Sequence, residues 1–317
     1  MNTLGMWLKK PWFGPLLALI VVYALFSALT PDTFLRTLNL VTMLRQTVVV
    51  SIAAVGMALI IIHGGIDLSV GSAVALTTVV VAKTLQGGAS PLTAVLTALL
   101  LGALAGLLNG ALVVGLRITP FIATLGTMSA LRGIAKGLAD EQKIDAPARG
   151  IDDWMAIAPG EHLVPYGVWL ALATAVLFAL VLGYTRLGRH AVAVGSNEQT
   201  ARLCGVPVAR VRLVIYAIGG LLAGLAGILE FSTLTVGDPT DSVGLELEAI
   251  AAVVIGGGSL SGGQGSVAGT LIGALLLTVI KAGCTHLGMP NWIQEILTGA
   301  IIVVAMTLDR LRQSARD

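Results

Sequence analysis

The sequence predicts an all-α polytopic membrane protein with about ten transmembrane helices, some of them broken or re-entrant at glycine-rich segments. The 317 residues are 56% hydrophobic and 11% charged, whereas a soluble domain carries about 25% charged residues. The apolar residues come in blocks of about 20, the length that a helix needs to cross roughly 30 Å of hydrocarbon. Glycine, proline or charged residues separate these blocks.

Ten apolar blocks cover most of the chain, which we treat as one transmembrane domain, residues 1–317. The eighth block is too short to cross a membrane alone, and the third and ninth begin inside glycine-rich stretches, which favours re-entrant segments. The expected spans are 12–30, 44–63, 68–86, 92–115, 119–138, 165–184, 212–234, 246–258, 266–286 and 291–308.

Loop charges predict the orientation, because cytoplasmic loops carry an excess of Lys and Arg. Both ends of the chain and the loop at about 185–211 are basic, whereas the loop at about 140–164 is acidic. With ten spans, the termini and the basic loop are expected in the cytoplasm and the acidic loop outside. The basic residues are Lys9, Lys10, Arg186, Arg189, Arg202, Arg210, Arg212, Arg310, Arg312 and Arg316; the acidic ones are Asp140, Glu141, Asp145, Asp152, Asp153 and Glu161.

A faint internal repeat surrounds two glycine breaks, at 64–72 and 257–266. In each, a small apolar helix leads to a glycine break, a Leu-Ser pair, and Gly and Ser opening another helix. Paired breaks of this kind indicate a substrate path in repeat-built transporters; close helix packing by small residues is the alternative explanation. The candidate pathway residues are Asp67, Ser69, Ser72, Asn109, Ser259, Ser261 and Gln264.

Several carboxylates adjoin apolar runs. Asp67 directly precedes a helix-like stretch at 68–85, so it is expected either to cap that helix or to contact substrate, with His63 as a neighbour. Glu230, Glu246 and Glu248 flank two later runs. They either line an external vestibule, where carboxylates would accept hydrogen bonds from polyol hydroxyls, or lie at the membrane interface.

The basic loop has the composition of an ordered segment. Asn197 and Glu198 are expected to open a short helix over 197–203, which Gly205 and Pro207 would end. Such a helix, lying parallel to the membrane, suits docking against a cytoplasmic protein. The alternative is a basic loop resting on anionic lipid headgroups.

Motifs for catalysis are missing from the sequence. It contains no G-x-x-x-x-G-K-[ST] for ATP, no nucleophile elbow and no H-E-x-x-H. Cys204 and Cys284 have no CxxC or Cys/His ligand spacing. We therefore expect no enzyme, no metal site and no cofactor in this chain, and no nucleic-acid partner.

Four segments in order resemble the inner-membrane permeases of bacterial ABC importers for monosaccharides, the ribose-permease type. The similarity covers about residues 12–308. The segments that carry it are Gly64–Ser72, Thr119–Gly126, Gly188–Val208 and Glu248–Gly257 followed by Ser261–Gly263.

This resemblance implies a second permease copy, a cytoplasmic ABC ATPase that uses the ATP, and a periplasmic sugar-binding protein. It implies that the loop at 185–211 couples the permease to the ATPase, and that the chain lies in the bacterial inner membrane. The residues expected to couple are Arg189, Gly195, Asn197, Glu198, Ala201, Gly205 and Val206. It does not specify the sugar, or whether the two permeases are identical.

Other functions remain possible on the sequence alone. A related permease for a branched-chain amino acid or a nucleoside would share the same architecture. A secondary transporter driven by protons or sodium through Asp67 and His63 would need no ATPase. A membrane enzyme lacks a catalytic set, and an ion channel lacks a filter motif.

Overall fold

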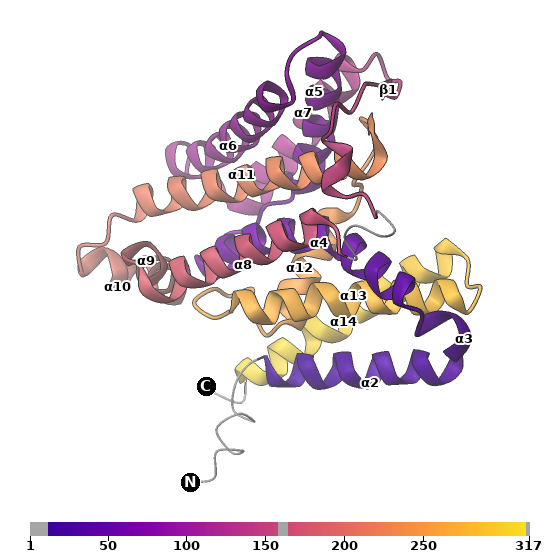
Figure 1. The fold of residues 1–317 in the computed structure, drawn as a ribbon. Helices are drawn as coiled ribbons and strands as arrows, with labels where there is room; N and C mark the ends of the chain where they lie inside the picture. The colour runs from indigo at the N-terminus through magenta and orange to yellow at the C-terminus, as the bar shows by residue number, and fades with distance from the viewer. Residues whose placement is uncertain (1–11, 158–163, 315–317) are drawn as a thin grey trace.

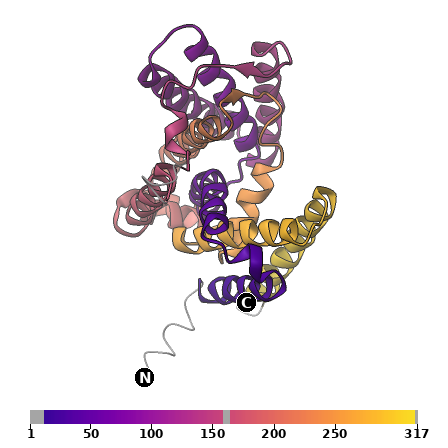
Figure 2. The same ribbon diagram turned by 45° about the vertical axis from the view of Figure 1, so that its right-hand side comes forward.

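The computed structural model describes residues 12–157 and 164–314. Within this part of the chain it has thirteen α-helices, one short 3-10 helix and two short strands, so the predicted all-α class is confirmed (Figure 1 and, from a second side, Figure 2). Lys9, Lys10, Glu161 and Arg316 lie outside the described residues, as do the side chains of Arg310 and Arg312.

Ten helices correspond to the ten expected spans, within a few residues at most ends. They are α2 (Phe13–Leu29), α4 (Thr37–Ile62), α5 (Val70–Gln86), α6 (Pro91–Gly115), α7 (Pro120–Leu138), α8 (Tyr166–Tyr184), α11 (Val208–Leu234), α12 (Leu245–Ile255), α13 (Val267–His286) and α14 (Asn291–Ser314). The smaller elements are α3 (Pro31–Phe34), β1 (Ile144–Asp145), the 3-10 helix Asp152–Trp154, α9 (Arg186–Ser196), α10 (Glu198–Leu203) and β2 (Val236–Gly237).

Five of the described helices are long and apolar enough to cross a membrane on their own, namely α4, α6, α8, α11 and α13. α2, α5 and the first part of α14 are shorter apolar helices. α12 has 11 residues, which span only about 16 Å. As expected from the sequence, it cannot cross alone.

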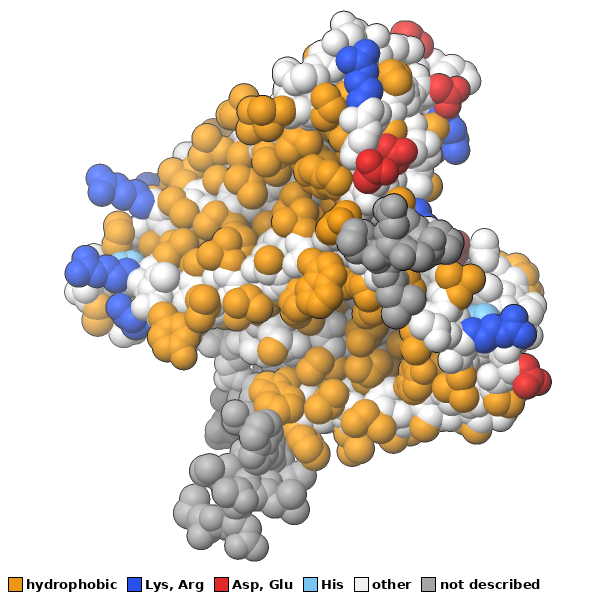
Figure 3. Space-filling view, viewed as in Figure 1, with side chains coloured by type: hydrophobic (Ala, Val, Ile, Leu, Met, Phe, Trp, Pro, Cys, Tyr) orange, Lys and Arg blue, Asp and Glu red, His pale blue; other side chains and the backbone are white. Residues whose placement is uncertain are grey.

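Charge gathers at the two ends of the bundle. One end, which we call the basic end, carries α9 and α10 with Arg186, Arg189 and Arg202, and Figure 3 shows Lys and Arg side chains gathered there. The opposite, acidic end carries the segment 139–157. Between them the surface is largely apolar in Figure 3, as a lipid-facing band requires. Along α6, every fourth residue of this band is an exposed leucine: Leu92, Leu96, Leu100, Leu104 and Leu108.

Small residues bring the central helices into backbone contact. A Cβ atom added to Gly102 or Gly220 would overlap a main-chain oxygen of the facing helix, so α6 and α11 touch through glycine. Gly256 and Gly269 place α12 against α13 in the same way. The packing role of small residues, one of the two explanations of the glycine content, therefore holds at these helix pairs.

α5 and α12 are half-helices that begin inside the bundle. Gly237 packs against Ala82, whereas Ser242 and Leu245 lie against Gly71 in the first turn of α5. The segment 237–245 thus runs beside α5 for about 16 Å, toward the start of that helix. α12 therefore begins next to the beginning of α5, and the chain beyond its end reaches Ile62 and Gly195 near the basic end. The segment from 237 to the end of α12 is thus a broken span, one of the two forms that the sequence predicted, and not a re-entrant one.

Candidate functional site

Three predicted pathway residues form one buried cluster in the first glycine break. The Asp67 carboxylate accepts hydrogen bonds from the N–H and the hydroxyl of Ser69, at 2.8 and 2.6 Å. The Asn109 amide of α6 donates to both Asp67 oxygens at 3.2 Å and to the Ser69 hydroxyl at 2.8 Å. All three side chains are buried. The cluster therefore joins the break to α6.

The Asp67 carboxylate was expected to cap α5, but it binds the residue just before that helix. Ser69 occupies the N-cap position of α5 without a side-chain cap hydrogen bond, and Asp67 binds the N–H of Ser69. This pattern is an Asx turn. It holds the break that leads into α5, whereas a cap would bind N–H groups within the helix.

Neighbouring helices satisfy the backbone that the first break leaves open. The hydroxyl of Tyr216 on α11 donates to the Ile66 carbonyl at 3.1 Å, and Thr124 on α7 donates to the same oxygen at 3.3 Å. Irregular backbone at membrane depth needs such partners. Ser72, also predicted for the pathway, is buried in the first turn of α5, and its hydroxyl has no partner among the described residues.

The other three predicted residues lie in the second break, the turn between α12 and α13. The Ser259 N–H donates to the Gln264 carbonyl at 3.1 Å, and the Ser261 N–H donates to the Ser259 hydroxyl at 3.3 Å. Gly262 and Gly263 have φ of 87° and 74°, a conformation that favours glycine. The result is a tight turn between α12 and α13.

Segment α9–α10 forms two consecutive helices at the basic end. The Asn197 side chain accepts the N–H of Thr200 at 2.8 Å, which places the start of α10 where the sequence predicts it. Gly205, with φ of 80°, follows its end. α9 was missed, because the sequence suggested a loop there. The available signal was the spacing of Gly188, Ala191 and Val194, which form its buried face.

The last turn of α9 rests where the two breaks meet. A Cβ atom added to Gly195 would overlap the Ile62 carbonyl and the Gly263 nitrogen. Only glycine lets α9 approach this junction so closely. Ala201 of α10 is buried, and Val206 packs beside it, whereas Arg189 is exposed.

A polar bridge joins α10 to the first break. Arg212 on α11 donates to the His63 ring at 3.2 Å and to the Glu198 carboxylate at 2.9 Å. Arg202 donates to the other Glu198 oxygen at 2.6 Å. Hydrogen bonds from Arg202 and Arg212 hold the pKa of the Glu198 carboxyl below its usual range. Beside this bridge is a cavity of about 770 Å³ that Gly64 and Arg117 also line.

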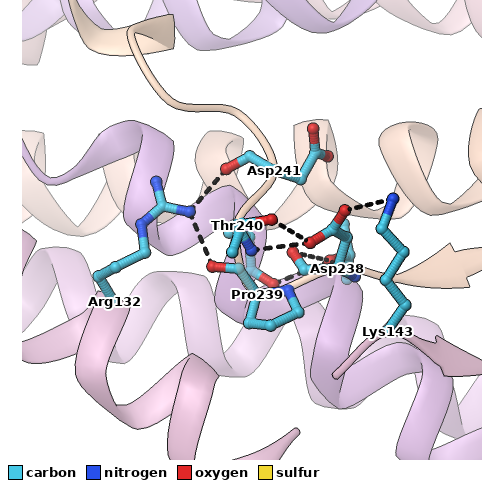
Figure 4. A network of polar contacts seen from close by, with 8 residues as sticks. Arg132, Lys143, Asp238, Pro239, Thr240 and Asp241 are labelled. Carbon is cyan, nitrogen blue, oxygen red and sulfur yellow. Dashed lines mark hydrogen bonds and ion pairs between the residues drawn. The ribbon is translucent and has the colours of Figure 1, made fainter. Parts of the chain in front are cut away.

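The acidic end contains a network that the sequence did not reveal. Arg132 on α7 donates to the carbonyls of Pro239 and Asp241, at 3.0 and 2.6 Å (Figure 4). Asp238 accepts from the N–H and hydroxyl of Thr240 and pairs with Lys143 at 3.0 Å. The sequence feature that could have indicated this network is Arg132 itself, an arginine inside an apolar span, where a charge is costly and usually functional.

These features define a membrane transport component: apolar helices, two linked glycine breaks, and a basic-end segment packed on the breaks. Residues 39–306 match the family described as the permease component of the branched-chain amino acid transport system. The chain therefore belongs to this permease family, and the predicted resemblance to ribose-type permeases is confirmed by the relatives given next.

The ribose import permease protein RbsC of Escherichia coli (strain K12) is 41% identical over 94% of this chain and 93% of its own. The D-allose transport system permease protein AlsC of the same strain is 33% identical over 96% and 95%. The L-arabinose ABC transporter permease protein AraH of Azospirillum brasilense is 32% identical over 98% and 91%. No solved structure matches the chain.

Proposed function

We propose that the chain is the transmembrane subunit of an ATP-binding-cassette importer that carries a monosaccharide across the bacterial inner membrane. Relatives named for ribose, L-arabinose and D-allose, each aligned over more than 90% of both chains, carry this proposal. Although the family description mentions branched-chain amino acids, these relatives favour a sugar. They also disfavour a nucleoside permease and an ion-driven transporter.

The partners follow from the class of transporter. A cytoplasmic ABC ATPase would supply the energy, since this sequence has no ATP-binding loop, and a periplasmic binding protein would deliver the sugar. A second permease copy, identical or related, would complete the path. We assign the basic end and both termini to the cytoplasm, because Arg and Lys concentrate in cytoplasmic loops.

We assign α9–α10 to the contact with the ATPase. Its exposed basic surface suits docking, and its buried side contacts both breaks through Gly195 and reaches His63 through Glu198 and Arg212. A displacement of this segment by the ATPase would thus act directly on the two breaks. Such differential contact is what a partner needs to shift a conformational equilibrium.

In this proposal, the cluster of Asp67, Ser69 and Asn109 would hold the transport path closed. They hydrogen-bond to one another and are buried. In this conformation a solute has no access to them, so contact with sugar would require the breaks to separate. Ser259, Ser261 and Gln264 would move with the second break.

The test is co-purification of the tagged permease from mild detergent, followed by mass spectrometry. We expect a P-loop ATPase at about one copy per permease chain and a periplasmic binding protein whose bound ligand identifies the sugar. Replacing both Asn197 and Glu198 with Ala should weaken ATPase recovery, with membrane insertion preserved. Lys136→Ala, at the opposite end, is the matched control. A permease that purifies alone and moves solute on an ion gradient without ATP would refute the proposal.

A further inference from the structure

A polar groove opens between α4, α12, α13 and α14, apart from the two glycine breaks. Its volume is about 450 Å³, within the roughly 300–1,000 Å³ usual for small-molecule sites. Most of its lining side chains carry hydrogen-bonding groups, although the groove lies among apolar helices. They include Asn39, Gln46, Glu248, Thr278, Lys281 and Gln294.

The groove reaches from the acidic end to the middle of the bundle. Along α4 it extends from Asn39 to Val50, which is about 16 Å of helix, and Val50 is near the midpoint of that helix. Glu248 lies in the first turn of the half-helix α12. Solute sites in transporters built from broken helices typically lie at this depth, beside half-helix N-termini.

Charge in the groove is balanced. Glu248 and Lys281 form an ion pair across α12 and α13, with side chains that are 22% and 38% exposed. Both groups therefore keep contact with the open groove. A carboxylate and an ammonium group that neutralise each other leave a lining that suits an uncharged solute rich in hydroxyl groups, because each can exchange hydrogen bonds with it.

Gln46 supplies a free amide. Among the described residues its side chain makes no hydrogen bond, and it is exposed toward the groove. It is the tenth residue of α4, about 14 Å from the start of the helix, so it lies at membrane depth. Because the groove is open, this amide is free to exchange hydrogen bonds with a polar occupant.

We propose that this groove is a binding site for the sugar in the outward half of the transport path. Gln46 would exchange hydrogen bonds with sugar hydroxyls, while Glu248 would accept and Lys281 would donate. This inference rests on the proposed importer function and adds a location and a set of contacts to it. It also assigns Glu248 to the vestibule, one of the two alternatives that the sequence left open.

The experiment uses the complete transporter, with its ATPase and binding protein, in proteoliposomes. In Gln46→Leu, the initial rate of sugar uptake should fall about five- to tenfold, the size expected for one lost hydrogen bond. ATP hydrolysis stimulated by the loaded binding protein should persist. Gln86→Leu, an exposed glutamine at the end of α5, should behave as wild type. Gln46→Asn should recover part of the uptake.

A second measurement keeps the proposal independent of folding defects. In a Cys204→Ser background, a water-soluble maleimide applied from outside should label Gln46→Cys, and the sugar-loaded binding protein with ATP should slow that labelling. Unchanged uptake in Gln46→Leu would overturn the proposed binding site. Equal labelling of Gln46→Cys with and without the sugar-loaded binding protein and ATP would do the same. A wild-type complex that imports no sugar would instead refute the importer function itself.

Discussion

The main-chain N–H of Gly263 donates a hydrogen bond of 2.8 Å to the carbonyl of Ile62, and this bond links the two glycine breaks. Ile62 is the last residue of α4, and Gly263 lies in the turn between α12 and α13. α9 packs against both residues through Gly195. Three segments that are distant in sequence therefore share one backbone junction, which can transmit a displacement without a flexible side chain.

The first prediction concerns Gly195. Its replacement by Ala should reduce sugar uptake strongly while the ATPase still co-purifies, because the added methyl group would overlap main-chain atoms of Ile62 and Gly263. Backbone atoms cannot move aside as a side chain can, so α9 must shift away from the breaks. Uptake and ATPase recovery should be measured on the same preparation.

Gly183→Ala is the matched control for this substitution. Gly183 lies in α8, and a Cβ atom there would meet no other atom within 4 Å. This variant should transport normally. Normal uptake in Gly195→Ala would show that the junction tolerates displacement and would remove the proposed route from α9 to the breaks.

The second prediction concerns Arg212. In Arg212→Lys the positive charge remains, but one ammonium group cannot reproduce the two-sided guanidinium bridge to His63 and Glu198. We expect weaker coupling, seen as more ATP hydrolysed per sugar imported. Arg210→Lys, two residues away and exposed, should leave the ratio unchanged. An unaltered ratio in Arg212→Lys would argue against the bridge as part of the coupling route.

The third prediction is a pH dependence of the same bridge. Because Arg202 and Arg212 hold the pKa of Glu198 below its usual 4.5, the ionised bridge stabilises the folded state above that value. The contribution disappears as the pH falls from 4.5 through the lower folded pKa. In thermal unfolding in detergent, wild type should therefore lose more stability than Glu198→Gln as the pH falls from about 5 to below the lowered pKa. Parallel curves for the two proteins would exclude this contribution.

The fourth prediction concerns Arg132. Its replacement by Ala leaves the carbonyls of Pro239 and Asp241 without their donor, which should cost about 1–3 kcal/mol. We expect a lower unfolding temperature and easier proteolysis of the segment 237–245. Lys136→Ala, on the exposed side of the same helix, should change neither. Unchanged proteolysis in Arg132→Ala would mean that other contacts hold the segment.

The sequence predicts the spans well because membrane helices are set by local hydrophobicity. All ten expected blocks are helices in the structure, and α10 begins at the predicted Asn197 cap. α9 was not predicted, because its buried face consists of small residues such as Gly188 and Ala191, which give little apolar signal beside Arg186 and Arg189. The descent of the segment 237–245 beside α5 was not predicted either, because its partners, such as Arg132, are distant in sequence.

The sequence predicted the residues of the candidate site, but only part of their geometry. Asp67 and Asn109 are 42 positions apart, and no local pattern indicates that they touch. Likewise, glycine content predicts close approach, but only the structure identifies Gly195 as the contact between α9 and both breaks. Gln46 was missed altogether, since a single amide in an apolar block has no pattern of its own.

The fifth prediction concerns Asp67. In Asp67→Asn, the oxygen that accepts from Ser69 can remain, but the second oxygen, which accepts from the Asn109 amide at 3.2 Å, becomes a second NH2 group facing that amide. The loss of this hydrogen bond and of the negative charge should destabilise the protein by about 1.5–3 kcal/mol. We therefore expect less protein in the membrane and a lower unfolding temperature, with unchanged preference among sugars. Yield, thermal unfolding and competition between sugars should be measured together.

Asp145→Asn, at an exposed site in the acidic end, is the control for loss of a carboxylate as such. It should match wild type in yield and transport. A complete loss of uptake in Asp67→Asn at normal yield and stability would show that the carboxylate acts on the solute. In that case the cluster would belong to the path itself, and the buried state of Asp67 would be one end of the transport cycle.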